Sequence, residues 1–325
     1  MSTIKEVAKY CGYSVATVSR VLNNDPVVKS ETREKVLAAI EALNYRPNLV
    51  AKNLRTQRSN SILVMIPTIA NPFYAEILRG IEQGVKETQM NPIIGTVELD
   101  QGHMDHFLEL LDSNQADGVI FVSSSITSDR LTEVAKKHPA VMCNEHFDPM
   151  PVSYVAIDNE AAAYEAACKL AEAGCKHIVY FSAARDSSSS IDRSAGVRRA
   201  GKECKNLTVD IIRGFDDFHD LKDKISNALE KQPEIDGLVM NSDINGTVAI
   251  RALVEMDLIP GKDVRIVSFD GTIISEITTP TLTCVKQPLF DLGYLAVRLL
   301  ENQMKEADAP VERLILPYEL TIRET

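Results

Sequence analysis

The stretch SVATVSRVLN, residues 14–23, presents two distinct surfaces when it is wound as an α-helix. One surface is apolar and consists of Val18, Val21 and Leu22. The other faces carry Val15, Ala16, Ser19 and Arg20. Ser14 is a residue type that caps helix N-termini. The apolar positions predict a helix anchored to a small core, which leaves the other faces to contact something else.

Two further helices are predicted on either side of this stretch. Thr3, followed three positions later by Glu6, forms a capping box, and Gly12 ends the helix that it begins. A third helix is expected from a Ser30 cap to about Leu43. Its buried positions are predicted to be Val36, Leu37, Ile40 and Leu43. Because the loop between the first two helices is very short, the segment predicts a helix-turn-helix.

Charge is distributed unevenly along the chain. The 325 residues carry a net charge of −11, but residues 1–58 hold ten basic and five acidic side chains, a balance of +5. The remainder holds 25 basic and 41 acidic side chains, a balance of −16. A basic head on an acidic body indicates that the head alone contacts a polyanion.

The segment NLVAKNLRT, residues 48–56, predicts a fourth, very short helix. Pro47 ends the preceding helix, Asn48 can cap a new one, and Val50, Ala51 and Leu54 recur at helical spacing. Helices shorter than about 12 residues are marginal in water. We therefore expect this helix to form fully only against a partner.

From residue 61 onward, buried β runs alternate with amphipathic helices. The runs are SILVMIP (61–67), NPIIGTVE (91–98), DGVIFVSS (117–124), AVMCNE (140–145), VSYVAID (152–158), HIVYFSA (177–183), LTVDIIRG (207–214), DGLVMN (236–241) and VRIVSFD (264–270). The end of the chain, VERLILPYELTIRET, predicts one final strand. This pattern is typical of α/β folds in which doubly wound parallel sheets have helices on both faces. About ten strands favour two such sheets.

Metal, membrane and enzyme functions find little support. The six cysteines, at positions 11, 143, 168, 175, 204 and 284, form no C-x-x-C pair, so reduced thiols are expected. No signal sequence or apolar span is present, which favours a cytoplasmic protein without a membrane partner. His103, Asp105 and His106 are interpreted as a solvated helix face, and 186–190 as a polar loop. Without a phosphate loop or nucleophile motif, neither catalysis nor a cofactor is expected.

Several segments of the chain closely resemble the lactose-repressor (LacI/GalR) family of bacterial transcription regulators. They are TIKEVAKYCGYSVATVSRVLNNDPVVKSETREKVLAAIEALNYRPNLVAKNLRT (3–56), IPTIANPFYAEILRGIE (66–82), NSDINGTVAI (241–250), VRIVSFDG (264–271) and TPTLTCVKQP (279–288). The resemblance covers almost the whole chain. It implies a homodimeric, sequence-specific DNA-binding regulator, most simply a repressor of a pseudo-palindromic operator. Its DNA affinity would be modulated by a small-molecule effector of sugar or nucleoside type.

The resemblance also implies a domain organisation. Residues 1–47 would form the helix-turn-helix domain, 48–58 the hinge helix and linker, and 59–325 an effector-binding and dimerisation core similar to periplasmic binding proteins. In that core, the N-lobe would comprise about 59–158 plus 288–314, and the C-lobe about 159–287 plus 315–325.

In the head, the resemblance assigns DNA contacts residue by residue. Val15 and Ala16 would contact base edges, where they suit a thymine methyl, and Arg20 would reach a guanine. Phosphate contacts are expected from Thr3, Ser14, Thr17 and Ser19. In the hinge helix, which includes Asn48 and Ala51, Leu54 would wedge into the central base step of the minor groove.

In the core, the resemblance places the effector between the lobes. The candidate contacts are Phe73 and Tyr74 as apolar walls, Ser242, Asp243 and Asp270 as hydrogen-bond acceptors, Gln287 at the lobe crossing, and Arg193. Asp243 could instead cap the helix that follows it, and Arg193 matches a position that is often structural. Ile191 stands where many members have an effector-clamping arginine, which disfavours an anionic effector. A protein partner in place of a small molecule is the alternative.

Overall fold

The computed structural model describes residues 2–22, 24–46, 58–88, 90–97, 101–122, 128–147, 151–182, 187–215, 217–306 and 309–325. The chain divides into two compact units, Met1–Arg58 and Ser59–Thr325, which we describe separately as the head and the core. The predicted hinge helix, with Asn48, Ala51 and Leu54, lies outside the described residues. Among the helices of the described ranges, none is long and apolar enough to span a bilayer.

The head contains helices α1 (Ile4–Cys11), α2 (Val15–Leu22) and α3 (Ser30–Ala42). The predicted capping box is confirmed, because the Thr3 hydroxyl accepts from the Glu6 N–H at 3.4 Å and the Glu6 carboxylate accepts from the Thr3 N–H at 2.7 Å. Gly12 ends α1 in the left-handed region, at φ 75°. The Ser14 hydroxyl accepts from the Thr17 N–H at 3.1 Å and so caps α2 as expected.

A small core holds the three helices of the head together. Its buried members are Val7, Ala8, Val18, Val21, Val36 and Ala39. The predicted burial of Leu37 is wrong: its side chain is 49% exposed, because the stripe through residues 36, 39, 40 and 43 of α3 faces the core. The predicted Ser30 cap is also wrong. Ser30 lies inside α3, where its hydroxyl donates to the Glu34 carboxylate at 3.2 Å.

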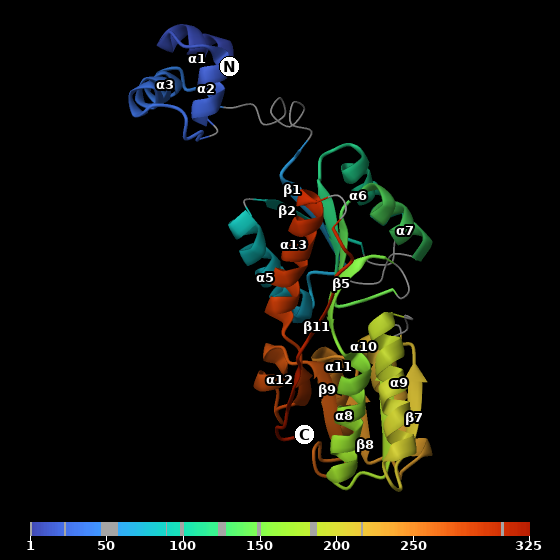
Figure 1. Cartoon of the computed structure of the whole chain (residues 1–325). Helices are drawn as coiled ribbons and strands as arrows, with labels where there is room; N and C mark the ends of the chain where they lie inside the picture. The colour runs from blue at the N-terminus through green and yellow to red at the C-terminus, as the bar shows by residue number, and fades with distance from the viewer. Residues whose placement is uncertain are drawn as a thin grey trace. The chain divides into compact units, whose positions relative to one another are not determined.

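The first lobe of the core is built on a parallel sheet in the order β11-β5-β4-β3-β1-β2. Its strands are β1 (Ser61–Ile66), β2 (Asn91–Thr96), β3 (Gly118–Phe121), β4 (Ala140–Cys143), β5 (Ser153–Ile157) and β11 (Arg313–Leu316). One face of the sheet packs on α5 (Pro72–Thr88) and α13 (Leu289–Lys305). The opposite face packs on α6 (Gln101–Asp112) and α7 (Ser128–Lys137) (Figure 1).

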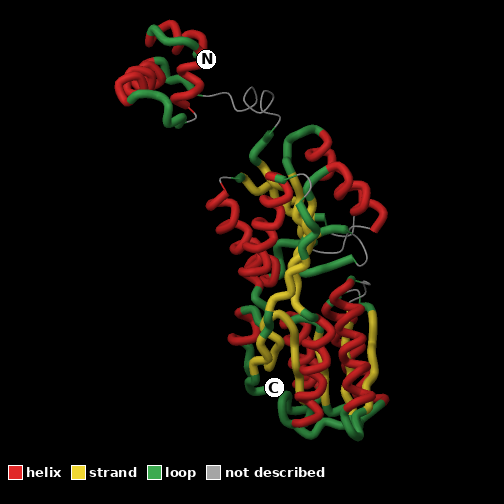
Figure 2. Tube along the Cα trace, viewed as in Figure 1, coloured by secondary structure: helices red, strands yellow, loops and turns green. Residues whose placement is uncertain are grey.

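The second lobe repeats this plan with the strand order β12-β10-β9-β8-β6-β7. Its strands are β6 (His177–Ser182), β7 (Thr208–Arg213), β8 (Gly237–Met240), β9 (Arg265–Asp270), β10 (Thr283–Lys286) and β12 (Glu319–Thr321), with β12 antiparallel to β10. One face packs on α8 (Asn159–Glu172) and α9 (Ser188–Glu203). The other packs on α10 (Phe218–Lys231) and α11 (Asp243–Glu255), and the short α12 (Ile273–Ile277) follows β9. Figure 2 shows the strands of both lobes between their helices.

Burial on both faces explains the continuous apolar runs of these strands. Along β1, Ile62, Val64 and Ile66 enter the core beneath α5 and α13, whereas Leu63 and Met65 enter the opposite one. Alternate side chains point to opposite faces of a strand, so a sheet covered twice needs apolar residues at every position. The predicted α/β class, with two doubly wound sheets beside an all-α head, is confirmed.

The end of the chain differs from the single final strand predicted. Residues 313–316 form β11 in the first sheet, and residues 319–321 form β12 in the second. Pro317 lies between them and has no N–H with which to continue a ladder. The chain therefore crosses between the lobes three times, after β5, after β10 and after β11.

We predict that Gly80→Ala destabilises the first lobe. A Cβ atom at position 80 of α5 would lie 1.9 Å from the carbonyl oxygen of Phe290 in α13, so the two helices would have to separate. The clash should outweigh the helix propensity gained by alanine and lower the free energy of unfolding by about 1–3 kcal/mol. Urea denaturation measures the loss. The matched control is Gln83→Ala on the exposed side of α5, which should change stability by less than about 0.5 kcal/mol.

Candidate functional site

Helix α2 presents the side chains that were predicted to contact DNA. Val15 is 40% exposed although it is apolar, and Ala16 and Arg20 are exposed beside it. Val18 and Val21 are buried on the opposite side of α2. The buried side of α2 therefore anchors the helix to the head, and its other side exposes Val15, Ala16 and Arg20 to solvent, as the sequence predicted.

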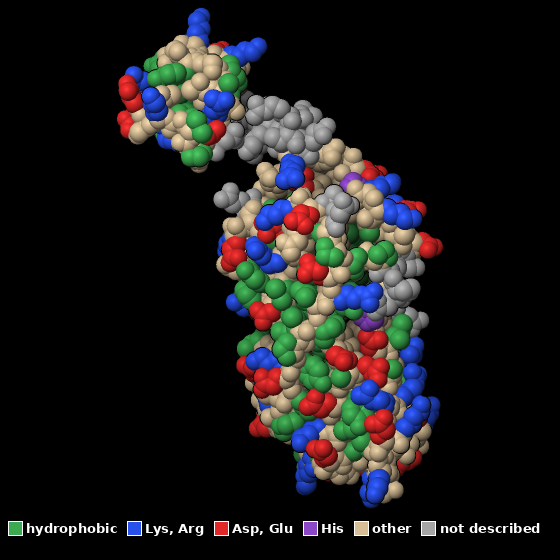
Figure 3. All heavy atoms as spheres, in the orientation of Figure 1, with side chains coloured by type: hydrophobic (Ala, Val, Ile, Leu, Met, Phe, Trp, Pro, Cys, Tyr) green, Lys and Arg blue, Asp and Glu red, His purple; other side chains and the backbone are tan. Residues whose placement is uncertain are grey.

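Polar side chains surround the N-terminus of α2. The Ser14 and Thr17 hydroxyl oxygens lie 2.9 Å apart, and Thr3 is exposed at the N-cap of α1. Backbone N–H groups at a helix N-terminus and neighbouring hydroxyls are donors that suit phosphate oxygens. On the face drawn in Figure 3, lysine and arginine side chains project from the head. The head therefore combines an exposed helix face with donors and positive charge.

In the core, five of the seven predicted effector residues lie in the second lobe, near the carboxyl ends of its strands. They are Arg193 in α9, Ser242 and Asp243 at the start of α11, Asp270 at the end of β9, and Gln287 after β10. This edge includes the switch point between β6 and β8, where the strand order reverses. Open α/β sheets generally bind ligands at such a point.

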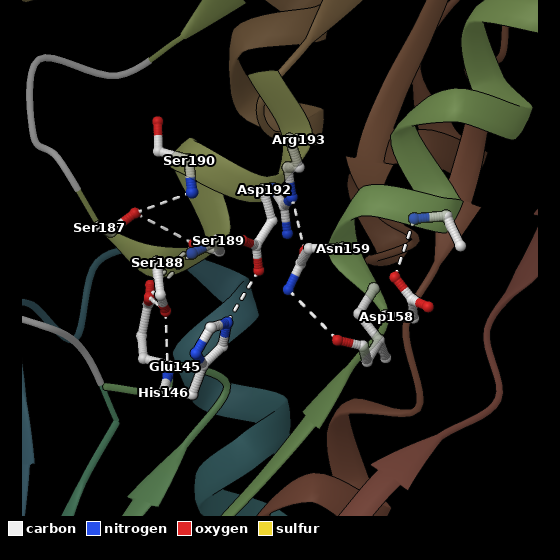
Figure 4. Close-up of polar contacts among 12 residues, drawn as sticks. Glu145, His146, Asp158, Asn159, Ser187, Ser188, Ser189, Ser190, Asp192 and Arg193 are labelled. Atoms are coloured by element: carbon white, nitrogen blue, oxygen red, sulfur yellow. Dashed lines mark hydrogen bonds and ion pairs between the residues drawn. The ribbon is translucent and has the colours of Figure 1, made fainter. Parts of the chain in front are cut away.

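Arg193 is held on three sides by the protein. Its Nε donates to Asn159 Oδ1 at 2.8 Å, as drawn in Figure 4, and its Nη1 donates to the Asn241 carbonyl at 3.0 Å. The guanidinium also lies 4.0 Å from the ring centroid of Phe269. With only 6% of its surface exposed, Arg193 joins α8, β8 and β9 at the switch point.

Asp243 is turned into the protein. Its carboxylate accepts from the Ser268 hydroxyl at 2.6 Å and from the Thr272 N–H and hydroxyl at 2.6 and 2.8 Å. Burial raises the pKa of this carboxyl, while those hydrogen bonds act in the opposite direction. The N-cap of α11 is Ser242, which accepts from the Asn245 N–H at 3.2 Å. The alternative interpretation of Asp243, as the cap of α11, is therefore wrong, because Ser242 is that cap.

Asp270 and Gln287 form a buried pair at one lobe crossing. Gln287 Nε2 donates to Asp270 Oδ1 at 3.0 Å, and the Gln287 N–H donates to the Asp270 carbonyl at 3.0 Å. Asp270 adopts φ 107°, a strained conformation for a residue other than glycine. Burial, followed by the charge of Asp243, raises the pKa of Asp270 to about 7. In the described part of the chain, Gln287 Oε1 is buried without a hydrogen-bond partner.

Phe73 and Tyr74 belong to the first turn of α5, in the first lobe. Phe73 is a buried core residue, Tyr74 packs against the same core, and the two rings meet edge to face with centroids 5.0 Å apart. The predicted effector residues thus fall on both sides of the lobe boundary.

Sequence reasoning missed a set of bonds that joins the two lobes directly (Figure 4). Glu145 follows β4 in the first lobe and is 5% exposed. Its carboxylate accepts from the Ser188 hydroxyl, and from the Ser189 N–H and hydroxyl at 3.1 and 2.8 Å. The neighbouring His146 Nε2 lies 2.8 Å from an Asp192 carboxylate oxygen. The first turn of α9 is therefore capped by a carboxylate from the other lobe.

Two signals in the sequence could have located these residues. Asn144, Glu145 and His146 are polar and directly follow a buried strand, where parallel sheets place their sites. The serine run was interpreted as a loop, which is wrong for its described part: Ser187 caps α9, and residues 188–190 form its first turn. Serine caps helices well, so the run indicated a helix N-terminus.

The charges around the lobe boundary are predominantly acidic. Glu145, Asp192 and Asp270 lie in this region, whereas Arg193 is already bound to protein oxygens. Ile191 is 50% exposed. Hydroxyl groups of a neutral ligand could donate to these acceptors. Across the described residues, no group of three or more His, Cys, Asp or Glu side chains is arranged to hold a metal ion.

Comparisons with known proteins cover both units. The family profile described as "Bacterial regulatory proteins, lacI family" matches residues 3–48, and "Periplasmic binding protein-like domain" matches residues 167–325. Catabolite control protein A of Priestia megaterium is 32% identical over 327 residues, 99% of this chain and 98% of that protein. A ribose operon repressor of Halalkalibacterium halodurans is 33% identical, covering 100% and 97% of the two chains. A solved transcriptional regulator CelR–cellobiose complex is 26% identical, with a TM-score of 0.75 and coverage of 100% and 99%.

We predict that Asp270→Asn flattens the pH dependence of stability. Because the pKa of Asp270 is raised to about 7 in the folded protein, the folded state retains a proton that the unfolded state releases above about pH 4. The free energy of unfolding should therefore fall between pH 4 and 7, by at most roughly 1.4 kcal/mol per pH unit from this group. The asparagine variant should lose that component in urea denaturation followed by circular dichroism. If the free energy of unfolding depended on pH in the same way in both proteins, the raised pKa would not belong to Asp270.

Proposed function

Since the chain belongs to the lacI family of bacterial regulatory proteins, and is a DNA-binding transcriptional regulator rather than an enzyme, we propose that it acts as a homodimeric repressor. In this proposal each head binds one half of a pseudo-palindromic operator in the cytoplasm. A neutral effector of sugar or nucleoside type binds between the lobes. The observation that carries the DNA-binding part is the outward face of α2, backed by buried Val18 and Val21.

The proposed division of labour within α2 follows from side-chain chemistry. Arg20 reaches the O6 and N7 atoms of a guanine, which accept a bidentate guanidinium. Val15 and Ala16 lie in the first turn and contact thymine methyl groups. Thr3, Ser14, Thr17 and Ser19 contact phosphates and fix the register of the head on the duplex.

The hinge part of the proposal rests on sequence, because its residues lie outside the described ranges. Asn48 and Ala51 belong to a short helix that pairs with its twin in the minor groove. Leu54 wedges into the central base step and bends the operator. The unstacking costs a few kcal/mol, which the two heads offset by binding both half-sites.

Exposed apolar side chains on the core support the proposed dimer. Ile273 and Ile277 of α12 are 57% and 66% exposed, and Phe290 at the start of α13 is 38% exposed. Figure 1 draws α12 and α5 along the same side of the core. A two-fold axis through this side would bury these residues and present two heads to a two-fold symmetric site.

The effector class follows from the charges at the lobe boundary. Glu145 already occupies the N-terminus of α9, where a phosphate or carboxylate would otherwise bind. A neutral sugar or nucleoside can instead donate hydroxyls to Asp270 and to the Gln287 amide oxygen. The names of the ribose operon repressor and of the cellobiose complex support a sugar.

Effector binding would act on DNA through the angle between the lobes. A ligand that competes with the Glu145–Ser189 contact, or spans it, changes how the lobes meet and so shifts the hinge helices between ordered and unfolded states. The coupling is reciprocal, so operator and effector must change each other's affinity by the same factor.

One observation favours the second candidate, a regulator that responds to a protein partner. The lobes are joined directly by polar contacts among Glu145, His146, Ser188, Ser189 and Asp192, which an effector would have to displace or span. In that case a partner protein on the outer surface would select between arrangements of the lobes. Screening neutral sugars and nucleosides for an increase in the melting temperature of the full chain separates the two candidates.

We predict that Arg20→Ala relaxes sequence preference at one base pair. Full-length protein should first select a two-fold symmetric site from a randomised duplex pool, two chains per duplex in sedimentation. Against single-base variants of that site, the alanine variant should lose about 1–3 kcal/mol of discrimination at one position per half-site. The control, Lys9→Ala, alters charge on α1 and should weaken all sites equally. Uniform loss for Arg20→Ala would show that Arg20 contacts only phosphate.

We predict that neutral sugars or nucleosides, and not sugar phosphates, raise the melting temperature of the full chain. Glu145→Gln should remove the repulsion and improve binding of a phosphorylated sugar about tenfold relative to its neutral parent, or roughly 1.4 kcal/mol. The matched control is Glu319→Gln at an exposed position of β12. It should change the binding of neither the phosphorylated sugar nor its neutral parent. If no small molecule stabilises the protein, the effector part fails and the protein-partner candidate gains support.

A further inference from the structure

Two thiols face each other on the second lobe, away from the effector residues. Cys168 lies in the last turns of α8, and Cys204 caps the C-terminus of α9. Their sulfur atoms are 3.0 Å apart. A disulfide requires about 2.05 Å, so the two sulfur atoms must approach by about 1 Å to form the bond.

The helices that carry these thiols are held firmly against each other. The Arg199 guanidinium of α9 pairs with Glu160 of α8 at 2.6 Å and lies 4.1 Å from the ring centroid of Tyr164. A Cβ atom on Gly196 would lie 2.1 Å from the Glu160 carbonyl oxygen, so the backbones are in close contact. The two sulfurs are therefore positioned by the packing of both helices rather than by chance proximity of flexible chains.

A groove of about 650 Å³ gives solvent access to the pair. Its lining includes Tyr164, Cys168, Arg199, Cys204, Lys205 and Tyr318. Both thiols are partly exposed, whereas Cys143, Cys175 and Cys284 are buried and Cys11 belongs to the head. A small oxidant can thus reach Cys168 and Cys204 together.

We propose that Cys168 and Cys204 form a redox modification site, in which a low-molecular-weight disulfide oxidises the pair to an intramolecular disulfide. Thiols in a reducing cytosol stay reduced, so the bond would form under oxidative conditions and be reversed afterwards. This site lies away from the effector residues and adds a second input to the core.

The exchange proceeds in two balanced steps. The Cys204 thiolate attacks one sulfur of the oxidant, forms a mixed disulfide and releases one small thiolate. The Cys168 sulfur then attacks Cys204, the second small thiolate leaves, and the Cys168 proton passes to it. The protein loses two hydrogens and the oxidant becomes two thiols. We assign the first attack to Cys204 because it is followed by Lys205, a cation that lines the same groove, whereas burial raises the pKa of Cys168.

The bond would fix the far ends of two helices whose N-termini reach the lobe boundary. Asn159 begins α8 and holds Arg193, and Ser188 and Ser189 begin α9 and bind Glu145. A link at the opposite ends prevents α8 and α9 from sliding past each other. Oxidation therefore acts on the same pair of helices that the lobes use to meet.

The test incubates the full chain with oxidised glutathione and maps its peptides without reduction. We expect a linked Cys168–Cys204 peptide, a fall from six titratable thiols to four after denaturation, and recovery of six with dithiothreitol. The melting temperature of the oxidised form should rise by roughly 5 °C or more, because the link lowers the conformational entropy of the unfolded chain.

Single variants separate the roles of the two thiols. Cys168→Ser should retain glutathione on Cys204, and Cys204→Ser should leave Cys168 largely unmodified over the same time. The control, Cys175→Ser, removes a buried thiol that contacts the Asp236 carbonyl and should still form the link. Three outcomes would overturn the proposal. The protein could keep all six thiols after incubation with oxidised glutathione, it could carry stable glutathione adducts on both cysteines, or it could form a link to another cysteine.

Discussion

Burial of the central strands of each sheet on both faces is the constraint on which the core depends. Strands such as β1 contribute side chains to two separate cores, so a polar side chain within the sheet needs a hydrogen-bond partner, as Ser268 of β9 has in Asp243. Polar residues must therefore collect where the strands end. In both lobes that edge meets the lobe boundary, so Glu145 after β4 and Asp270 at the end of β9 belong to a single functional region.

Within that region the protein satisfies its own charges. The carboxylate of Glu145 caps α9, Arg193 is bound by Asn159 and the Asn241 carbonyl, and Asp243 is enclosed by Ser268 and Thr272. Asp270 and Gln287 differ from these residues. Asp270 has a strained backbone and a raised pKa, and among the described residues the buried Oε1 atom of Gln287 has no hydrogen-bond partner. Strain and unsatisfied polarity accumulate where a ligand can relieve them.

The sequence predicted the elements better than the contacts between them. Helical periodicity and the Thr3–Glu6 capping box located α1 and α2, and continuous apolar runs located β1 to β9, since these patterns are local. Leu37 was misassigned because the apolar residues of α3 do not define one sharp face, and the Ser30 cap was wrong by one residue, because α3 begins at Ser30 with Lys29 at its N-cap. The Glu145–Ser189 contact joins residues 44 positions apart in different lobes, so no local pattern could reveal it. The hinge residues remain predictions.

In the proposed mechanism, the lobe crossings would connect a bound effector to both lobes. Gln287 binds Asp270 through its side chain and its backbone, and it lies two residues before α13. Helix α13 packs backbone to backbone on α5, because Gly293 meets the Ile77 carbonyl and Gly80 meets that of Phe290. A glycine contact of this kind allows little independent movement of the two helices. A ligand that displaces Gln287 would therefore move α13 and α5 together, carrying the first lobe as one body.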